Sequence, residues 1–139
     1  MSKNAIFSYF NDAVNRSLKA IPKYESRKSV IGAIAIRKDG TIVHSHNGGA
    51  KRHSPNSHAE ARICRKIDAD AIIYIARIRR DNYKLDLARP CIHCFNRMRA
   101  YKVSKVYYSI SPNEYGVIND FDIKDESDFY MPDFSSVNF

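Results

Sequence analysis

Four residues of the sequence have the types and the spacing of a metal site with an acid–base group beside it. Cys91 and Cys94 are three positions apart, so on a helix they share one face and can hold one ion between two sulfurs. Free backbone N–H groups at the start of such a helix favour the thiolate forms. His58 completes a set of three protein ligands, which leaves the fourth position of a tetrahedral Zn²⁺ open for water. Glu60, two residues further on, can move a proton of that water, so the pattern predicts a catalytic zinc.

Each part of this pattern also has a simpler interpretation. Ser57 and Glu60 have the spacing of a capping box, so Glu60 could serve only to cap a helix. The Cys-x-x-Cys pair could be a redox pair or half of a structural zinc site, which needs a fourth ligand. His93 is the nearest candidate but points to the opposite side of the helix from Cys91, and His53 in the preceding loop is another. The combination favours catalytic zinc, because His-x-Glu and Pro-Cys-x-x-Cys each open a predicted helix after a predicted strand.

The composition is that of one folded domain over residues 1–139. Hydrophobic residues make up 44% of the chain and charged residues 27%, which is too apolar for a disordered tail and too polar for a membrane protein. No apolar run approaches the roughly 20 residues that span a bilayer. The N-terminus has no secretory signal, so we expect a cytoplasmic protein without disulfides, in which Cys64 is a small core residue.

The net charge of +8 is unevenly distributed along the chain. Residues 1–112 carry 22 Lys and Arg against 8 Asp and Glu, whereas residues 113–139 carry one Lys against 7 acids. The basic body is expected to attract phosphates, either on a nucleotide or along a nucleic-acid backbone. The acidic C-terminal tail could be solvated or could fold back over that basic surface.

The hydrophobic periodicity predicts an α/β protein in which two helices begin at the same edge of a mixed sheet. We expect helices over residues 4–18, 57–67 and 90–101, and strands over residues 29–37, 41–46, 71–79 and 103–110. Lys38-Asp39-Gly40 supplies a hairpin turn between the first two strands. The third strand is apolar on both faces, and residues 112–139 give no clear element. Crossovers through the second and third helices place both helix starts at one edge, where α/β folds carry their chemistry.

The motifs His58-Ala59-Glu60 and Pro90-Cys91-Ile92-His93-Cys94 resemble the signature of the zinc-dependent cytidine/deoxycytidylate deaminase superfamily. The resemblance covers roughly residues 29–112 and is strongest to small phage and bacterial deoxycytidylate-type enzymes, so a virus-encoded protein is one expectation. It implies a cytidine-deaminase-like mixed five-stranded sheet flanked by helices. It also implies that His58, Cys91 and Cys94 bind Zn²⁺ and that Glu60 shuttles protons. The reaction would be hydrolytic deamination of cytosine to uracil with release of ammonia, and adenine could be attacked by the same machinery.

Five further residues are candidates for binding the substrate. Residues 40–48 resemble the strand and turn of deoxycytidylate deaminases that end in an Asn-Gly pair, and this resemblance assigns the sugar to Asn47. Ala59 belongs to the His-x-Glu motif, and the loop cations Lys51 and Arg52 are placed near a phosphate. Tyr108 is the candidate to stack on the base.

Tyr107 and Tyr108 alternate across a strand, so only one of them can face the site, and Tyr115 could assist it. A competing interpretation is a cytosine or adenine deaminase acting on single-stranded DNA or RNA. The two tyrosines and the following loop resemble the aromatic strand of such enzymes, and four cations follow the third predicted strand closely: Arg77, Arg79, Arg80 and Lys84. We favour a free nucleotide or nucleoside as the partner, with no membrane partner, and self-association is a family expectation.

Overall fold

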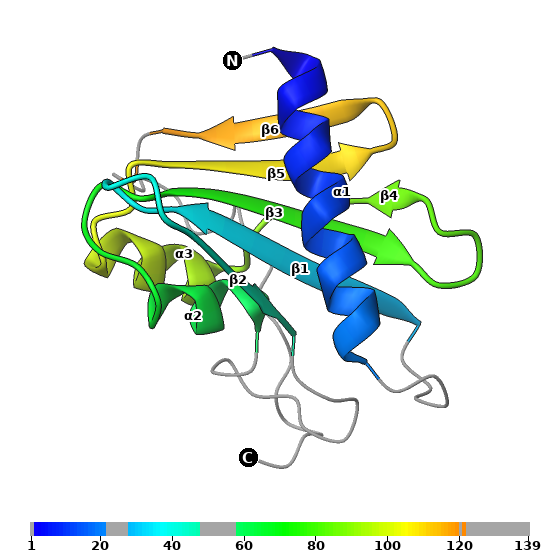
Figure 1. Ribbon diagram of the computed structural model, residues 1–139, viewed down its shortest axis with the longest axis horizontal. Coiled ribbons are helices and arrows are strands. Elements are labelled where there is room, and N and C mark those ends of the chain that lie inside the picture. The colour runs from blue at the N-terminus through cyan, green and yellow to red at the C-terminus, as the bar shows by residue number, and fades with distance from the viewer. Residues whose placement is uncertain (1, 22–27, 48–57, 120, 122–139) are drawn as a thin grey trace.

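The computed structural model of the chain describes residues 2–21, 28–47, 58–119 and 121 (Figure 1). Within these residues one mixed sheet is flanked by three helices. In chain order the elements are α1 (Lys3–Ala20), β1 (Ser29–Ile36), β2 (Ile42–His46), α2 (Ala59–Cys64), β3 (Ile72–Arg79), β4 (Leu85–Asp86), α3 (Ile92–Ala100), β5 (Lys105–Ser111) and β6 (Glu114–Ile118). This order confirms the predicted α/β class and all the elements predicted from periodicity.

The sheet has six strands in the described part of the chain, one more than the resemblance implied. Five of them form a continuous path in the order β2-β1-β3-β5-β6, and the sixth, β4, pairs only with the end of β3. A strand of two residues is too short to produce a hydrophobic period, which is why the sequence did not reveal β4. β3 and β5 run parallel, while the other neighbouring strands are antiparallel.

The first two strands form the predicted hairpin. The turn is closed by a hydrogen bond of 2.8 Å from the Arg37 amide to the Thr41 carbonyl. Gly40 has a φ of 89°, a left-handed conformation that glycine adopts without a steric penalty. Asp39 accepts a hydrogen bond of 2.9 Å from the Thr41 amide. The turn residues therefore fix the register that pairs Ile36 with Ile42.

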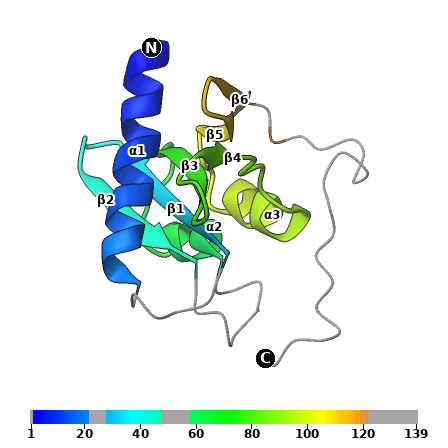
Figure 2. The same cartoon turned by 90° about the vertical axis from the view of Figure 1, so that its right-hand side faces the viewer.

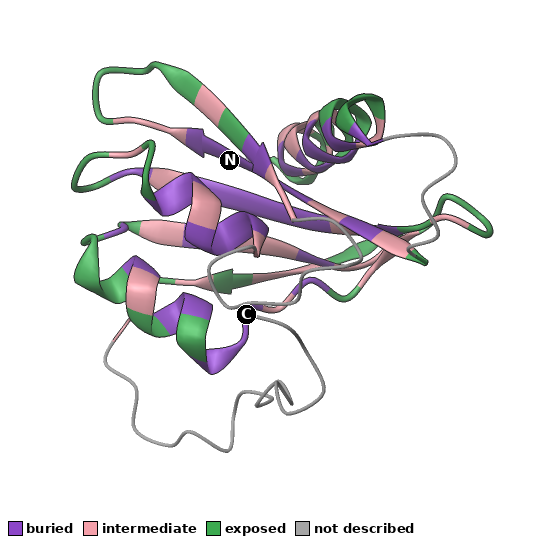
Figure 3. Ribbon diagram, turned by 90° about the horizontal axis from the view of Figure 1, so that it is seen from below, coloured by how far each residue is buried: buried purple, intermediate pink, exposed green. Residues whose placement is uncertain are grey.

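The two faces of the sheet bury two separate cores. α1 covers one face with Ile6, Phe10 and Val14, while α2 and α3 lie on the other (Figure 2). β3 contributes to both, because Tyr74 packs toward α1 and the neighbouring Ile75 toward α2. Figure 3 shows β3 buried along most of its length between these layers. The strand predicted to be apolar on both faces is thus the centre of the sheet.

α1 approaches the sheet closely at Gly32 of β1. A Cβ atom at this position would collide with the Ala13 carbonyl and with the Ser17 hydroxyl of α1. That hydroxyl is buried and donates a hydrogen bond of 2.8 Å to the Ala13 carbonyl. The helix backbone leaves no room for a side chain on the strand.

Gly32→Ala is therefore expected to destabilise the protein by about 1–3 kcal/mol, the usual cost of overpacking. Urea or thermal unfolding followed by circular dichroism measures the effect. Gly40→Asn is the comparison, because nothing lies within 4 Å of a Cβ atom there. Its cost should be the smaller one of a side chain in a left-handed conformation, which Asn tolerates better than most residues. Equal stability of Gly32→Ala and the parent would contradict the close packing.

Candidate active site

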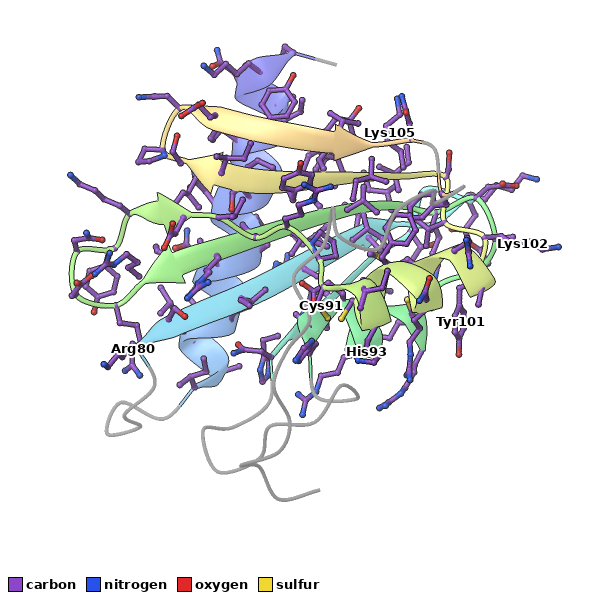
Figure 4. The ribbon with its side chains drawn as sticks, turned by 180° about the vertical axis from the view of Figure 1, so that it is seen from behind. Arg80, Cys91, His93, Tyr101, Lys102 and Lys105 are labelled. Carbon is purple, nitrogen blue, oxygen red and sulfur yellow. The ribbon has the colours of Figure 1, made fainter. Side chains whose placement is uncertain are left out.

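Two helices begin next to each other at one edge of the sheet, and each begins at a candidate metal ligand. α2 follows β2 and starts after His58, and α3 follows β4 and starts after Cys91. His58 and Cys91 are the N-cap residues with extended backbone, so the predicted helix starts at residues 57 and 90 were two positions early. Neither side chain caps its own helix, which leaves both to point at each other. Figure 4 shows Cys91 at the start of α3, with Tyr101 and Lys102 at the opposite end of that helix.

His58, Cys91 and Cys94 converge on one point. The His58 Nδ1 atom lies 3.2 Å from the Cys94 sulfur and 3.7 Å from the Cys91 sulfur. All three ligand atoms lie within 4.8 Å of one another. A tetrahedral Zn²⁺ with usual bond lengths separates a nitrogen ligand from a sulfur ligand by about 3.6 Å. The donor set and its spacing therefore fit one zinc ion.

The thiol groups of the pair differ in their proton affinity. Hydrogen bonds with Cys94 and His58 lower the pKa of Cys91 well below its usual range. The same hydrogen bond to Cys91, together with burial, raises the pKa of Cys94. The hydrogen bond with Cys91 raises the pKa of His58, despite its burial. Cys91 is thus the cysteine that most readily becomes a thiolate, the form that binds a metal.

Glu60 is buried beside the three candidate ligands. Its side chain is only 4% exposed, and its Oε2 atom accepts a hydrogen bond of 3.4 Å from the Cys94 sulfur. Burial raises the pKa of this carboxyl group. Because the N-cap of α2 is His58, Glu60 is the second helical residue and not the third, as a capping box requires. Ser57, its proposed partner in that box, lies outside the described residues. The geometry therefore favours the acid–base interpretation of Glu60 over the capping interpretation.

Two buried serines form hydrogen bonds to the backbone near the candidate ligands. Neither serine was predicted from the sequence. The Ser45 hydroxyl of β2 donates a hydrogen bond of 2.6 Å to the Ala59 carbonyl, between His58 and Glu60. The Ser109 hydroxyl of β5 donates to the Asp86 carbonyl at 2.7 Å, ahead of the segment that leads to Cys91. Strand alternation was the available signal, because it places Ser45 on the same face of β2 as the half-buried Val43.

The candidate substrate residues occupy different surroundings. The Asn47 side-chain oxygen accepts a hydrogen bond of 3.1 Å from the Ile31 amide, so this side chain is anchored at the end of the β1–β2 hairpin. Ala59 is fully buried in the core under α2. Lys51 and Arg52 lie outside the described residues. The roles of all four residues in substrate binding remain predictions.

The two neighbouring tyrosines of β5 face opposite sides of the sheet. Tyr108 packs against the core under α2 and α3, on the side of the metal ligands, with its ring over Gly116. Tyr107 packs on the α1 side, where it stacks on Tyr74 with ring centroids 5.0 Å apart. Tyr115 lies on that side too, with its ring centroid 6.2 Å from that of Tyr107. The expectation that Tyr115 assists Tyr108 was therefore wrong. Because side chains alternate along a strand, only one of Tyr107 and Tyr108 can face the site. The side on which α1 packs decides that it is Tyr108.

The other described candidates for metal binding do not belong to the ligand cluster. Cys64 is fully buried in the core, where burial raises its pKa to about 12, and it does not belong to the group of converging ligands. His93 is exposed on α3 and is not part of that group either. His53 lies outside the described residues. Within the described residues, the cluster therefore has three protein ligands, as a catalytic zinc requires.

Arg77 and Arg79 of β3 have partners on β1 and in the turn after β3. Arg77 donates a hydrogen bond of 3.2 Å to the Ser29 hydroxyl, and Arg79 forms an ion pair of 2.8 Å with Asp81. Arg80 lies at the end of β3, well separated from Cys91 in Figure 4. Arg80 is therefore remote from Cys91, whereas Arg77 lies on the same face of β3 as Ile75, the side that α2 and α3 cover.

The sheet, the helix starts and the Cys₂His cluster define an α/β zinc protein, and comparison with known proteins identifies its family. The family of the cytidine and deoxycytidylate deaminase zinc-binding region matches residues 7–110, so the chain belongs to this family. The fold is similar to a 1.6 Å crystal structure of cytidine deaminase from Burkholderia pseudomallei, with a TM-score of 0.56 at 17% identity. That similarity covers 86% of this chain and 93% of the other. A search of curated protein sequences found no significant match.

These findings confirm the predicted superfamily and fold, and the family and the ligand cluster together support Zn²⁺ as the cofactor. Membership of this family supports zinc-dependent hydrolytic deamination of cytosine in general. None of the described helices is long and apolar enough to span a membrane.

The thiol pKa values predict the order in which the cysteines react when the metal is removed. At pH 6 the Cys91 thiol loses its proton more readily than the Cys64 thiol, because hydrogen bonds lower the pKa of Cys91 while burial raises that of Cys64 to about 12. After brief chelation at pH 6, iodoacetamide is therefore expected to label Cys91 before Cys64, as followed by peptide mass spectrometry. The zinc-loaded protein is the control and should resist labelling at Cys91. Earlier labelling of Cys64, in protein that retains its far-ultraviolet circular dichroism, would contradict this assignment.

Proposed function

We propose that this protein hydrolyses the amino group of cytosine in a free nucleoside or nucleotide, giving the uracil product and ammonia. The observation that carries this proposal is the buried carboxyl group of Glu60 beside His58, Cys91 and Cys94. A buried acid with a raised pKa, next to three metal-ligating side chains, is suited to accept and return protons.

The four residues divide the chemistry between them. His58, Cys91 and Cys94 would hold Zn²⁺, which when bound supplies Lewis-acid chemistry by lowering the pKa of water to about 7. Glu60 takes one proton from the attacking water as the water oxygen bonds to C4 of the ring. Glu60 delivers this proton to ring N3, then takes the second proton from the oxygen now bonded to C4 and passes it to the amino group. The C4=O bond forms as the C4–N bond breaks, and ammonia leaves. One water is consumed for each ammonia released.

A free nucleoside or nucleotide is supported by the residues on the metal side of the sheet. Tyr108 lies on that side, and Asn47 is anchored at the end of the β1–β2 hairpin, which precedes α2. Tyr107, one of the two adjacent tyrosines of the polynucleotide interpretation, lies on the opposite side. We propose that Asn47 contacts the sugar and that Lys51 and Arg52 contact a phosphate.

An assay with a panel of substrates tests this proposal. Purified zinc-loaded protein is incubated with cytidine, deoxycytidine, dCMP, dCTP, their adenine counterparts and single-stranded oligonucleotides, and formation of the deaminated product is followed by chromatography. We expect uracil product from at least one free cytosine nucleoside or nucleotide. Efficient conversion of single-stranded DNA or RNA, with none of the small substrates converted, would overturn the choice of carrier.

The salt dependence of KM distinguishes a free nucleotide from a single strand as the substrate. A single strand that contacts several phosphate-binding residues loses affinity with salt at a slope of about −0.7 per contact on logarithmic axes. A free nucleotide offers few phosphates, so its KM should depend only weakly on salt. A steep dependence of KM for the preferred substrate would support the polynucleotide alternative.

A further inference from the structure

A groove on the α1 side of the sheet is separate from the metal ligands. It has a volume of about 630 Å³, within the range of about 300–1,000 Å³ typical of ligand pockets. Its walls come from the first half of α1, the β3–β4 hairpin and the turn between β5 and β6. These two turns lie on the same side of α1 in Figure 1. None of its lining residues belongs to α2 or α3, so the reaction proposed above does not use it.

The groove is positively charged. Lys3 of α1 and Lys84 of the β3–β4 hairpin line it, and none of its lining residues is acidic. The acidic residues of the two hairpins have partners within their own hairpins. Asp81 is in an ion pair with an arginine, Asp86 accepts from a backbone amide at 2.8 Å, and Glu114 accepts from a serine hydroxyl at 3.0 Å. The groove should therefore attract an anion.

An exposed aromatic ring stands at the groove. Tyr83 is 63% exposed and has a φ of 55°, a left-handed conformation that is rare for a bulky residue. Its amide donates a hydrogen bond of 2.8 Å to the Arg79 carbonyl, which holds the hairpin in this conformation. Strained residues of this kind are concentrated at ligand-binding sites. Phe7 adds a second ring, with the Lys3 ammonium 5.8 Å from its centroid.

Asparagine side chains complete the lining. Asn4 and Asn11 of α1 and Asn113 of the β5–β6 turn each offer a hydrogen-bond donor and an acceptor. Ammonium groups suit a phosphate, an exposed ring suits the flat face of a base, and amides suit the polar edge of a base. Lipid and simple inorganic anions would use the cations but not the rings and amides together.

We propose that this groove is a second site, which binds the phosphate-and-base unit of a nucleotide. The unit can be a free nucleotide or part of a single strand, because both present the same chemistry. The proposal does not depend on the deamination reaction, and its test measures binding alone.

The sequence contains no tryptophan, so a single introduced tryptophan reports on one position. Tyr83→Trp places the reporter at the groove and keeps an aromatic ring, while Tyr101→Trp places it at the far end of α3 as a matched control. The probes are dTMP and a twelve-residue oligothymidylate, because thymine has no amino group that the enzyme could remove. We expect saturable quenching of the fluorescence of Tyr83→Trp and little change in Tyr101→Trp.

Charge removal then tests whether the quenching arises in the groove. In the Tyr83→Trp background, Lys3→Gln together with Lys84→Gln should weaken binding by about tenfold or more at low salt. Lys19→Gln is the control, since Lys19 is an exposed lysine at the other end of α1. Tyr83→Asn keeps a residue that tolerates the left-handed conformation and removes the ring, so it should weaken binding by about tenfold without loss of thermal stability. For this variant, binding is followed by the anisotropy of a labelled probe.

The possible outcomes either test the proposed site or identify the kind of ligand that it binds. Quenching by dTMP at concentrations similar to those of the oligothymidylate supports a free nucleotide, and quenching by the oligothymidylate alone supports a single strand. No quenching by either probe, an equal response of Tyr101→Trp, or binding that is insensitive to the lysine substitutions would overturn the site. Deaminase activity on a small substrate should be unchanged in all the lysine variants, which separates this site from the metal centre.

Discussion

Glu60→Gln is expected to slow turnover by at least about 10²-fold while the zinc content and the fold are retained. Loss of a positioned general acid–base typically costs 10²–10⁴-fold. Glutamine has nearly the same size and keeps a hydrogen-bonding side chain at this position, but it cannot take a proton from water. Steady-state kinetics on the preferred substrate, with metal analysis of the same sample, measure both effects. A variant that loses zinc or unfolds, while its folded fraction stays active, would restore the capping interpretation.

The pH dependence of stability provides an independent check on Glu60. Burial raises the pKa of Glu60 above its ordinary value of 4.5, so the folded state holds this proton more firmly than the unfolded chain does. The contribution to stability is therefore fully present below pH 4.5 and is lost as the pH rises through the raised pKa. Glutamine has no such proton. The Tm of Glu60→Gln relative to the parent should thus increase over that window, and a constant difference would contradict the raised pKa.

Cys94→Ala is expected to abolish zinc binding and activity and to lower the Tm strongly. Removing one of three ligands leaves two, and the free energy of metal binding is coupled to folding. Metal analysis of protein purified without chelator should give about one Zn²⁺ per chain for the parent and far less for the variant. Thermal unfolding with and without a chelator measures the coupling, which should be present in the parent and absent in the variant.

Cys64→Ala is the matched control for this experiment. Cys64 is also a buried cysteine, but it packs in the core and not in the ligand cluster. Its replacement should cost some stability through lost packing and should keep the metal. Equal loss of zinc from both variants would mean that unfolding, and not ligation, explains the effect in Cys94→Ala.

The candidate site was predictable because its chemistry depends on residue types at short spacings. His58 with Glu60, and Cys91 with Cys94, are local motifs, and the crossover topology brings the two motifs to one edge. The helix starts were less accurate, because a periodic pattern does not show that His58 and Cys91 are N-cap residues with extended backbone. The two supporting serines, Ser45 and Ser109, depend on packing across strands, which spacing alone does not reveal.

The last strand, β6, was not predicted from the sequence. β6 contains Gly116 in a short segment without clear alternation, so the sequence offered no strand signal. In the structure Gly116 is opposite Tyr108, and the tyrosine ring occupies the space where a side chain would be. The strand is therefore specified by a partner eight residues earlier in the chain. The sides taken by Tyr107 and Tyr115 likewise depend on where α1 packs.

The separation of the ligands along the chain has a consequence for the unfolded protein. His58 and Cys91 are 33 residues apart, and the segment between them contains β3, the middle strand of the sheet. An ion held by both residues would close this segment into a loop, and a permanent cross-link of that length removes chain entropy worth on the order of 3–4 kcal/mol. Where the ion stays bound to both residues after unfolding, the reaction centre also restricts the denatured ensemble. Where the ion is released, its binding free energy adds to the stability of the folded state. Substitution of a ligand alters both properties together, whereas substitution of Glu60 alters the chemistry and leaves the closed loop in place.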